Sequence, residues 1–322
     1  MTKDFKTGLI VLFVLILIIC GVTVTSFYMP NNINITSSSI YKVDYTKNYK
    51  GQYVGLVYLT GTIEEKNNEY NQDWILNTIS KLKDDKKNVG MVLYIDSPGG
   101  SVYQADQVYF ALKEYKASGK ALEVYMGPLA ASGGYYIACA ADEIWANRNT
   151  LTGSIGVIAG QSFDMTEFLK NLGIKSETIH AGKNKNMMNY NEEFTDEQRQ
   201  IMQSIADECY EQFCKIVAEE RGLTIEKVHE LADGRIYSAN QAFSNGLIDN
   251  IGTLDKAVDN LTTKLEKPGI KVTNYSYESK ESFISTLMGI INSSNTKARG
   301  ILPEEILQDI ENSDLYPAYL YK

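Results

Sequence analysis

The chain has 322 residues, 44% of them hydrophobic and 22% charged, which is ordinary for a globular protein with a buried core. Its length predicts one or two domains. The formal net charge of -9 argues against nucleic-acid binding, which needs clustered lysine and arginine. The four cysteines match no zinc-binding spacing and are expected to be free thiols, so we expect no metal and no cofactor.

The N-terminus carries a long apolar run. Residues 8–24 read GLIVLFVLILIICGVTV, and the run continues to Tyr28 without a charge. That is about the 20 residues that a helix needs to cross a bilayer. A cleaved signal peptide is the alternative, but its apolar region is usually shorter, about 7–15 residues, and it ends at a small-residue cleavage site that is not visible here. We therefore expect residues 1–28 to be a short tip and an uncleaved transmembrane helix.

The charges before this run predict its orientation. Lys3 and Lys6 favour a cytoplasmic N-terminus by the positive-inside rule. The rest of the chain would then lie outside the cytoplasm, held at the cell membrane by a single span. Ile19 stands before Cys20, where a lipoprotein signal needs a small residue. A polar stretch rich in Asn, Ser and Thr follows and predicts a linker over residues 29–50.

The body of the chain alternates predicted strands with predicted helices. A long amphipathic helix is expected from Thr195 to Arg221, with Thr195 as its cap and Asp196 and Glu197 at its positive end. This alternation predicts an α/β fold with covered sheets. The other expected strands are 54–63, 89–100, 121–127, 144–146, 155–158 and 175–180, and the other helices are 71–83, 101–118, 130–141, 164–172, 224–232, 239–246 and 254–266.

Three short segments could carry chemistry. The first is DSPGG, residues 96–100, where a strand ends in a turn of two glycines. Such a turn can direct backbone N–H groups at an anion, because glycine tolerates the necessary backbone angles and lets a ligand approach closely. A plain turn between a strand and a helix is the alternative for this segment taken alone.

The second segment surrounds Ser132 in GPLAASGGYY, residues 127–136. Its small neighbours allow a substrate to approach the hydroxyl, and the following helix start offers N–H groups to an oxyanion. The segment shares the logic of a nucleophile elbow without its G-x-S-x-G pattern. A helix-capping serine is the alternative.

The third segment is AGKNK, residues 181–185. A serine nucleophile needs a base, and a lysine serves as one only when burial removes its proton. On an extended segment Lys183 and Lys185 would face the same side, so the residues alone do not choose between them. Two solvated loop lysines are the alternative.

Together with TGSIGVI (152–158) and ADGRIYSANQAFSNGLIDNIG (232–252), these segments resemble the signal peptide peptidase A family, relatives of the Clp protease and crotonase folds. Five motifs agree with the family in order and spacing, over about residues 54–257. The resemblance implies a Clp/crotonase-like fold, a superhelix of repeated β-β-α units, over residues 51–266. Residues 267–322 would form a C-terminal extension and tail.

The resemblance also implies the roles of individual residues. Ser132 would be the nucleophile and Lys185, the last residue of G-x-x-K, the general base. The backbone N–H groups of Gly100 and Gly133 would bind the oxyanion, and Ser154 would orient the lysine amine. The implied enzyme is a serine peptidase with a Ser/Lys dyad that degrades peptides, above all cleaved signal peptides, at the membrane.

Each motif occurs once, which matches the half-length form of the family. Those forms resemble ring or dome homo-oligomers in which serine and lysine come from neighbouring subunits. In the extension, an apolar face at residues 283–291 predicts a short helix. We also hypothesise that the tail, residues 314–322, can lie in an active-site groove as a substrate or plug.

Several alternatives remain beside this reading. A Ser/His pair using His180 is disfavoured, because no motif places an acidic partner to orient the imidazole. A membrane-anchored scaffold without catalysis would keep the fold and lose the chemistry. A crotonase-type enzyme acting on an acyl-thioester would use acidic residues instead. A membrane serine protease acting on a specific protein partner also stays open.

Overall fold

The computed structural model describes residues 45–279. These residues belong to one compact unit. The expected anchor, the C-terminal helix and the tail all lie outside the described residues. Within the described part, no helix is both long enough and apolar enough to cross a membrane.

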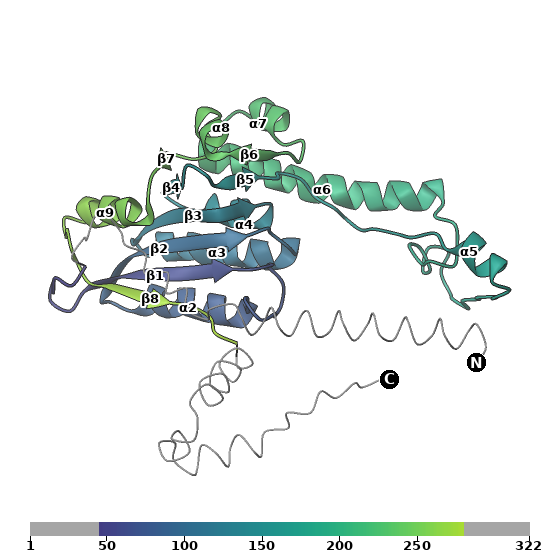
Figure 1. Ribbon diagram of the computed structural model, residues 1–322, viewed down its shortest axis with the longest axis horizontal. Helices are drawn as coiled ribbons and strands as arrows, with labels where there is room; N and C mark the ends of the chain where they lie inside the picture. The colour runs from purple at the N-terminus through teal and green to yellow at the C-terminus, as the bar shows by residue number, and fades with distance from the viewer. Residues whose placement is uncertain (1–44, 280–322) are drawn as a thin grey trace, which may run out of the picture. The chain divides into compact units, whose positions relative to one another are not determined.

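The described residues form one eight-stranded sheet (Figure 1). Its strands follow the order β6-β5-β3-β2-β1-β8; outside this path β4 pairs with β3, and β7 pairs with β4. Every pair is parallel except β5 with β6. The strands are β1 (Tyr53–Thr60), β2 (Asn88–Ser97), β3 (Ala121–Ala131), β4 (Glu143–Ala146), β5 (Leu151–Gly153), β6 (Ile236–Ser238), β7 (Asn250–Ile251) and β8 (Val272–Tyr275).

Strand β3 pairs with two different strands along the same edge, one after the other, so the sheet divides at this point. Its first part pairs with β4 from Glu123 to Met126, and its last part pairs with β5 from Leu129 to Ala131. Pro128 lies between the two parts and has no N–H to donate to a ladder, which explains why pairing changes there. The second part of β3 leads directly to Ser132.

Helices cover both faces of the sheet. The larger core lies against α2 (Gln72–Asp84), α3 (Val102–Ala117) and α4 (Gly133–Ala138). The smaller core lies under α9 (Leu254–Lys264) on the other face. Strand residues alternate between the two cores with the period of two that a pleated strand imposes. The structure therefore confirms the α/β class expected from the sequence.

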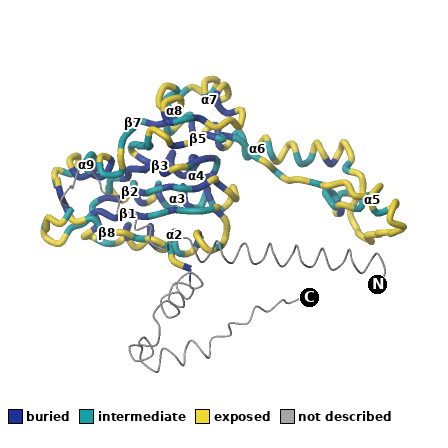
Figure 2. Tube along the Cα trace, in the orientation of Figure 1, coloured by how far each residue is buried: buried dark blue, intermediate teal, exposed yellow. Residues whose placement is uncertain are grey.

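The long helix α6 (Asp196–Arg221) projects away from the body that contains the sheet (Figures 1 and 2). Thr195 and Gln198 form a capping box at its start, and Gly222 ends it in the left-handed conformation with φ 61°. Residues 156–195, which include the short helix α5 (Thr166–Asn171), run from the body to the outer end of α6. We call residues 156–212 the arm. Helices α7 (Ile225–Leu231) and α8 (Ala239–Ser244) pack beside the inner end of α6.

Three sequence-based expectations are wrong in detail. Ala130 and Ala131 belong to β3, so the helix expected over 130–141 begins only at Gly133. The strands expected at 155–158 and 175–180 are absent from the described structure, because neither segment finds a neighbouring strand to pair with. The sheet also contains four strands that were not expected, β5 to β8, each of two to four residues.

Candidate active site

Ser132 occupies the junction between β3 and α4 in a strained conformation. Its backbone has φ 53° and ψ −121°, and its side chain makes no capping hydrogen bond to α4. Its N–H donates to the Gly153 carbonyl at 2.8 Å, and its carbonyl accepts from the Tyr136 N–H at 2.9 Å. Such a conformation costs about 1–3 kcal/mol in a residue other than glycine and tends to persist at functional sites. The serine is therefore no ordinary helix cap.

The glycine pair after β2 is required by close packing on the serine. Gly99 has φ 97°, and a Cβ there would lie 2.7 Å from both the Gly133 nitrogen and the Ser132 Cβ. Gly100 has φ 156°, and a Cβ there would lie 2.0 Å from the Ile63 carbonyl oxygen. Any larger residue would push the two turns apart.

Two N–H groups are free beside the serine. Neither the Gly100 nor the Gly133 amide donates a hydrogen bond to another described residue. The two amides are neighbours, because a Cβ built on Gly133 would lie 3.4 Å from the Gly100 nitrogen. Unpaired N–H groups next to a nucleophile are the arrangement that stabilises an oxyanion.

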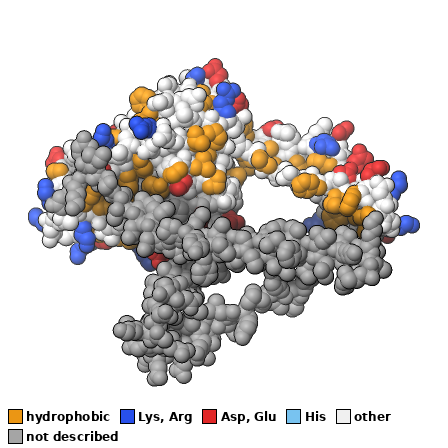
Figure 3. All heavy atoms as spheres, in the orientation of Figure 1, with side chains coloured by type: hydrophobic (Ala, Val, Ile, Leu, Met, Phe, Trp, Pro, Cys, Tyr) orange, Lys and Arg blue, Asp and Glu red, His pale blue; other side chains and the backbone are white. Residues whose placement is uncertain are grey.

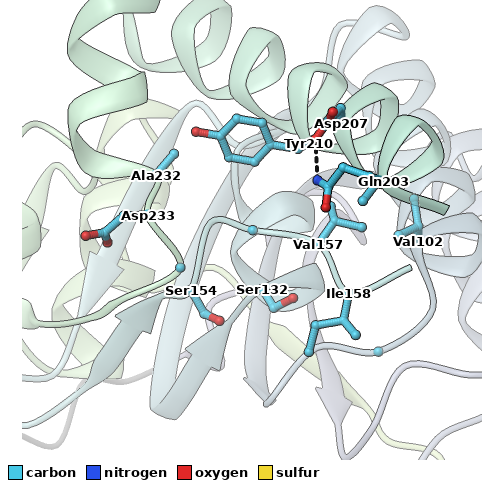
Figure 4. Close-up of a pocket in the computed structure, with 14 residues that line it drawn as sticks. Val102, Ser132, Ser154, Val157, Ile158, Gln203, Asp207, Tyr210, Ala232 and Asp233 are labelled. Atoms are coloured by element: carbon cyan, nitrogen blue, oxygen red, sulfur yellow. Dashed lines mark hydrogen bonds between the residues drawn. The ribbon is translucent and has the colours of Figure 1, made fainter. Parts of the chain in front are cut away.

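Ser132 opens into a cavity of about 660 Å³ (Figure 4). Ser154, also at a positive φ of 51°, lines the same cavity, and its N–H donates to the Arg235 carbonyl at 2.8 Å. Figure 4 shows the Ser132 and Ser154 side chains at the same side of the cavity. The described lining includes no lysine, arginine or histidine: it consists of Gly100, Val102, Ser132, Ser154, Gly156, Val157, Ile158, Gln203, Ala206, Asp207, Tyr210, Ala232, Asp233 and Gly234.

Sequence reasoning missed the wall that α6 gives to this cavity. Gln203, Asp207 and Tyr210 lie on one helix face, and Gln203 donates to Asp207 at 2.7 Å. Their spacing of four and three residues was the signal that could have revealed them. Burial raises the pKa of Tyr210 to about 12, so its phenol is neutral. At the rim, hydrogen bonds from Arg235 lower the pKa of Asp233 and keep it ionised.

Lys185 does not meet Ser132 within one chain. It lies on the arm, where it is exposed and lines a separate depression of about 390 Å³ together with Gln161, Phe163 and residues 186–190. Lys183 pairs with Glu197 at the outer end of α6. Lys185 makes no side-chain hydrogen bond or ion pair with any residue of the described range.

The segment around the two lysines is a series of turns and not an extended segment. The two side chains therefore have different surroundings, which an extended segment would not give them. The Lys183 amine is paired with the Glu197 carboxylate, whereas the Lys185 amine has no partner among the described residues. This difference favours Lys185 over Lys183 as the candidate base.

The two histidines lie away from the cavity. His180 contacts the Gly182 carbonyl and stands 4.0 Å from Glu192, both on the arm. His229 pairs with Glu211 at 3.1 Å and stacks on Tyr210. Neither residue lines the cavity that holds Ser132, so nothing in the described geometry supports a Ser/His pair.

Comparison with known proteins places this geometry in a family. Residues 114–267 match the model of peptidase family S49. A putative protease from Methanocaldococcus jannaschii is 30% identical over 291 residues, which are 86% of this chain and 88% of that protein. The chain belongs to peptidase family S49. This confirms the resemblance to the signal peptide peptidase A family, and a putative signal peptide peptidase from Enterococcus faecium is another relative in it, 35% identical over 222 residues, or 69% of this chain.

This S49 chain spans just under two thirds of the first curated relatives, 64% of the Enterococcus faecium protein and 63% of a putative protease from Synechocystis. It covers 41% of Protease 4 from Salmonella typhi, with 30% identity over 259 residues. Among solved structures, a ClpP1 mutant from Listeria monocytogenes matches with a TM-score of 0.45 and 17% identity, over 63% of this chain and 94% of that one.

Proposed function

We propose that this chain is a serine endopeptidase with Ser132 as nucleophile and Lys185 as general base. The observation that carries the proposal is the environment of Ser132. Its backbone is strained, its side chain makes no capping hydrogen bond, and it lines a cavity beside two N–H groups that have no partner among the described residues. Family membership supports the same reading, since the relatives from Enterococcus faecium and Salmonella typhi are named as a putative signal peptide peptidase and a protease. A scaffold without catalysis would have no use for a strained serine.

The chemistry follows from this geometry. Deprotonated Lys185 accepts the Ser132 proton as Oγ attacks the peptide carbonyl. The resulting oxyanion takes hydrogen bonds from the Gly100 and Gly133 N–H groups. The lysine then gives its proton to the departing amine, and water hydrolyses the acyl-enzyme. Ser154, which shares the cavity, orients the lysine amine while this occurs.

The lysine in this mechanism comes from a neighbouring copy of the chain. Lys185 is exposed on its own arm and shares no lining residue with the Ser132 cavity. A lysine amine that is removed from water releases its proton more easily. Insertion of the arm into the cavity of a neighbour supplies that burial and completes the dyad.

The surface of the arm supports such an assembly (Figure 3). Helix α5 has no buried residue, which is unusual for a folded helix that packs only within its own chain. Monomeric proteins rarely expose apolar groups in such density, and a closed ring or dome of identical copies would cover them. The large apolar side chains exposed there include Phe163, Met165, Phe168, Leu172, Ile174 and Ile179.

We further propose a membrane anchor at residues 8–28 and signal-peptide remnants as substrates. The anchor rests on the length of its apolar run, and the substrate rests on the name of the Enterococcus faecium relative. The catalytic domain then works on the outer side of the cell membrane. A protease for one specific membrane protein partner is the second candidate, because an anchored site would serve it equally well.

The test is cleavage of a fluorogenic peptide and a synthetic signal peptide by the full chain in detergent. Ser132→Ala and Lys185→Ala should each abolish cleavage, while Lys183→Ala, which removes the neighbouring amine, should retain it. Activity that survives Ser132→Ala would falsify the proposal. Loss with Lys183→Ala alone would move the base by two residues. An assembled but inactive wild type would favour the scaffold.

A further inference from the structure

Helix α6 has two halves with different surroundings. From Phe213 to Arg221 it packs into the body through Phe213, Cys214 and Val217, which are buried. From Asp196 to Gln212 only Gln198, at the outer end, is buried among the described residues. The outer half overhangs the Ser132 cavity and holds the Lys185 segment at its end, through contacts of Lys183 and Asn184 with Glu197. Its direction is therefore set where it leaves the body.

A three-residue hydrogen-bond cluster lies at that point. Tyr136 of α4 donates its hydroxyl proton to Asp106 of α3 at 2.5 Å. Gln212 of α6 donates to the same hydroxyl at 2.8 Å and to Asp106 at 3.4 Å. Three helices thus meet in one cluster, which we call the Tyr136 cluster. Gln212 is the residue of the overhanging half that lies nearest the body.

Tyr136 also connects directly to the nucleophile. Its backbone N–H donates to the Ser132 carbonyl at 2.9 Å, one turn along α4. Its ring is 4% exposed and packs edge-on against Tyr109 and Phe213, at 5.5 and 5.1 Å between centroids. The same side chain therefore fixes the helix that carries Ser132 and the helix that carries the arm.

The length of α6 makes this junction sensitive. Gln212 and Glu197 are 15 residues apart, so about 22 Å of helix lies between the cluster and the Lys185 segment. A tilt of about 3° at Gln212 moves the outer end by about 1 Å, and a misplacement of that size can cost about 100-fold in rate. A small change in the direction of α6 at the cluster therefore becomes a larger displacement at the outer end of the helix.

We infer that Tyr136, Asp106 and Gln212 are positioning residues that align the arm with the nucleophile helix. This inference rests on the proposed function, in which the arm delivers Lys185 to a neighbouring copy. The Tyr136 hydroxyl touches no substrate and takes no part in proton transfer. It acts by fixing the angle between α4 and α6, so its loss should lower kcat and leave KM nearly unchanged.

The test compares Tyr136→Phe with Tyr115→Phe in the full chain. Both changes remove one hydroxyl from a buried tyrosine, and Tyr115 donates to Asn88 at 2.6 Å, a contact that leaves α6 untouched. Tyr136→Phe should lower kcat about 5- to 20-fold with KM within twofold, and Tyr115→Phe should change neither by more than twofold. Gln212→Leu should resemble Tyr136→Phe, and the double variant should lose no more than either single one.

A second measurement does not depend on catalysis. Spin labels at Glu167→Cys on α5 and Lys81→Cys on α2 report the distance from arm to body, in a chain with Cys20 and Cys209 replaced by serine and diluted with unlabelled copies. Tyr136→Phe should broaden or shift this distance distribution, and Tyr115→Phe should not. An unchanged distribution in Tyr136→Phe overturns the inference, whatever its kcat. Absence of cleavage in wild type defeats the proposed function instead, while the distances still decide the role of the cluster.

Discussion

Arg221 and Asp249 form a two-bonded ion pair that secures the inner end of α6 to the sheet. Their nitrogen and oxygen atoms stand 2.6 and 3.0 Å apart, and the Arg221 side chain is only 6% exposed. Asp249 also accepts from the Ile144 N–H of β4 at 2.8 Å. Hydrogen bonds and the charge of Asp249 outweigh burial and raise the pKa of Arg221, so its guanidinium is charged at all physiological pH values. Asp249, which lies in the loop before β7, thus joins the long helix to β4.

Removing this guanidinium should destabilise the whole protein. Arg221→Met leaves a half-buried carboxylate without its partner and should cost about 2–3 kcal/mol, or about 5–10 °C in Tm. Arg199→Met is the matched control, because Arg199 is exposed and stands 4.0 Å from Asp196. The control should stay within about 0.5 kcal/mol. Thermal unfolding followed by tryptophan fluorescence measures both, and equal Tm values would show that the pair is not needed.

Mixing two inactive variants should restore activity. When Ser132→Ala and Lys185→Ala copies are co-expressed in equal amounts, about a quarter of the sites in a mixed ring combine an intact serine with an intact lysine of a neighbour. Peptide cleavage should therefore recover to about that fraction of wild type. In the control, the Lys185→Ala copies are replaced by copies that carry both substitutions, and this mixture should show no activity. No recovery in properly mixed assemblies would mean that serine and lysine act within one chain.

A methyl group at Gly100 should abolish catalysis more than it disturbs folding. Gly100→Ala places a Cβ 2.0 Å from the Ile63 carbonyl oxygen, so the turn must move and displace its N–H donor. Loss of one oxyanion donor costs about 100- to 1000-fold in kcat. Gly173→Ala is the control, because Gly173 also has a positive φ, 71°, but meets no atom within 4 Å. Kinetics together with circular dichroism separate the two effects; similar kcat values in both variants would contradict the oxyanion role.

The carboxyl of Glu123 should make stability depend on pH. Burial under α9 raises its pKa to about 7, against the opposing effect of Lys264, and one of its oxygens has no hydrogen-bond partner among the described residues. Asn260 and Glu143 also face it. Because the folded pKa lies above the unfolded one, the contribution of Glu123 to stability is greatest below about pH 4.5 and is lost as the pH rises through about 7.

Glu123→Gln removes this titration. Its Tm should fall less than that of wild type between pH 5 and pH 8, and at pH 8 the variant should be more stable by about 1 kcal/mol. Glu114→Gln is the control, since Glu114 is exposed and pairs with Lys83 on the far side of the sheet. Parallel Tm curves for wild type and Glu123→Gln would show that the carboxyl stays ionised in the fold.

Local sequence patterns predicted the elements that are long and strongly periodic. The helix from Thr195 to Arg221 appears with its cap, and the strands and helices before Ser132 lie within a few residues of expectation. Strands β5 to β8 were missed because two to four residues carry no visible alternation. Their pairing partners, such as Gly153 with Ile236, are far apart in the sequence.

The sequence likewise predicted only part of the candidate site. The Ser132 turn and its glycines were found because a tight approach of backbones leaves a signature of small residues. Spacing along the chain could not show that Lys185 lies in another depression, since that depends on how α6 carries the arm away from the body. The Tyr136 cluster was equally hidden, because its three members come from three helices and meet only after folding.

The separation of Ser132 from Lys185 has a consequence for how much of this protein a cell can safely make. Each newly synthesised copy carries two half-sites and no complete one, so on the proposed mechanism its proteolytic rate rises more steeply than its amount. With the proposed membrane anchor, low abundance would spare nearby proteins, and cleavage would begin only once copies had met in the plane of the bilayer. Dilution would then serve as the off state, with no propeptide or inhibitor required.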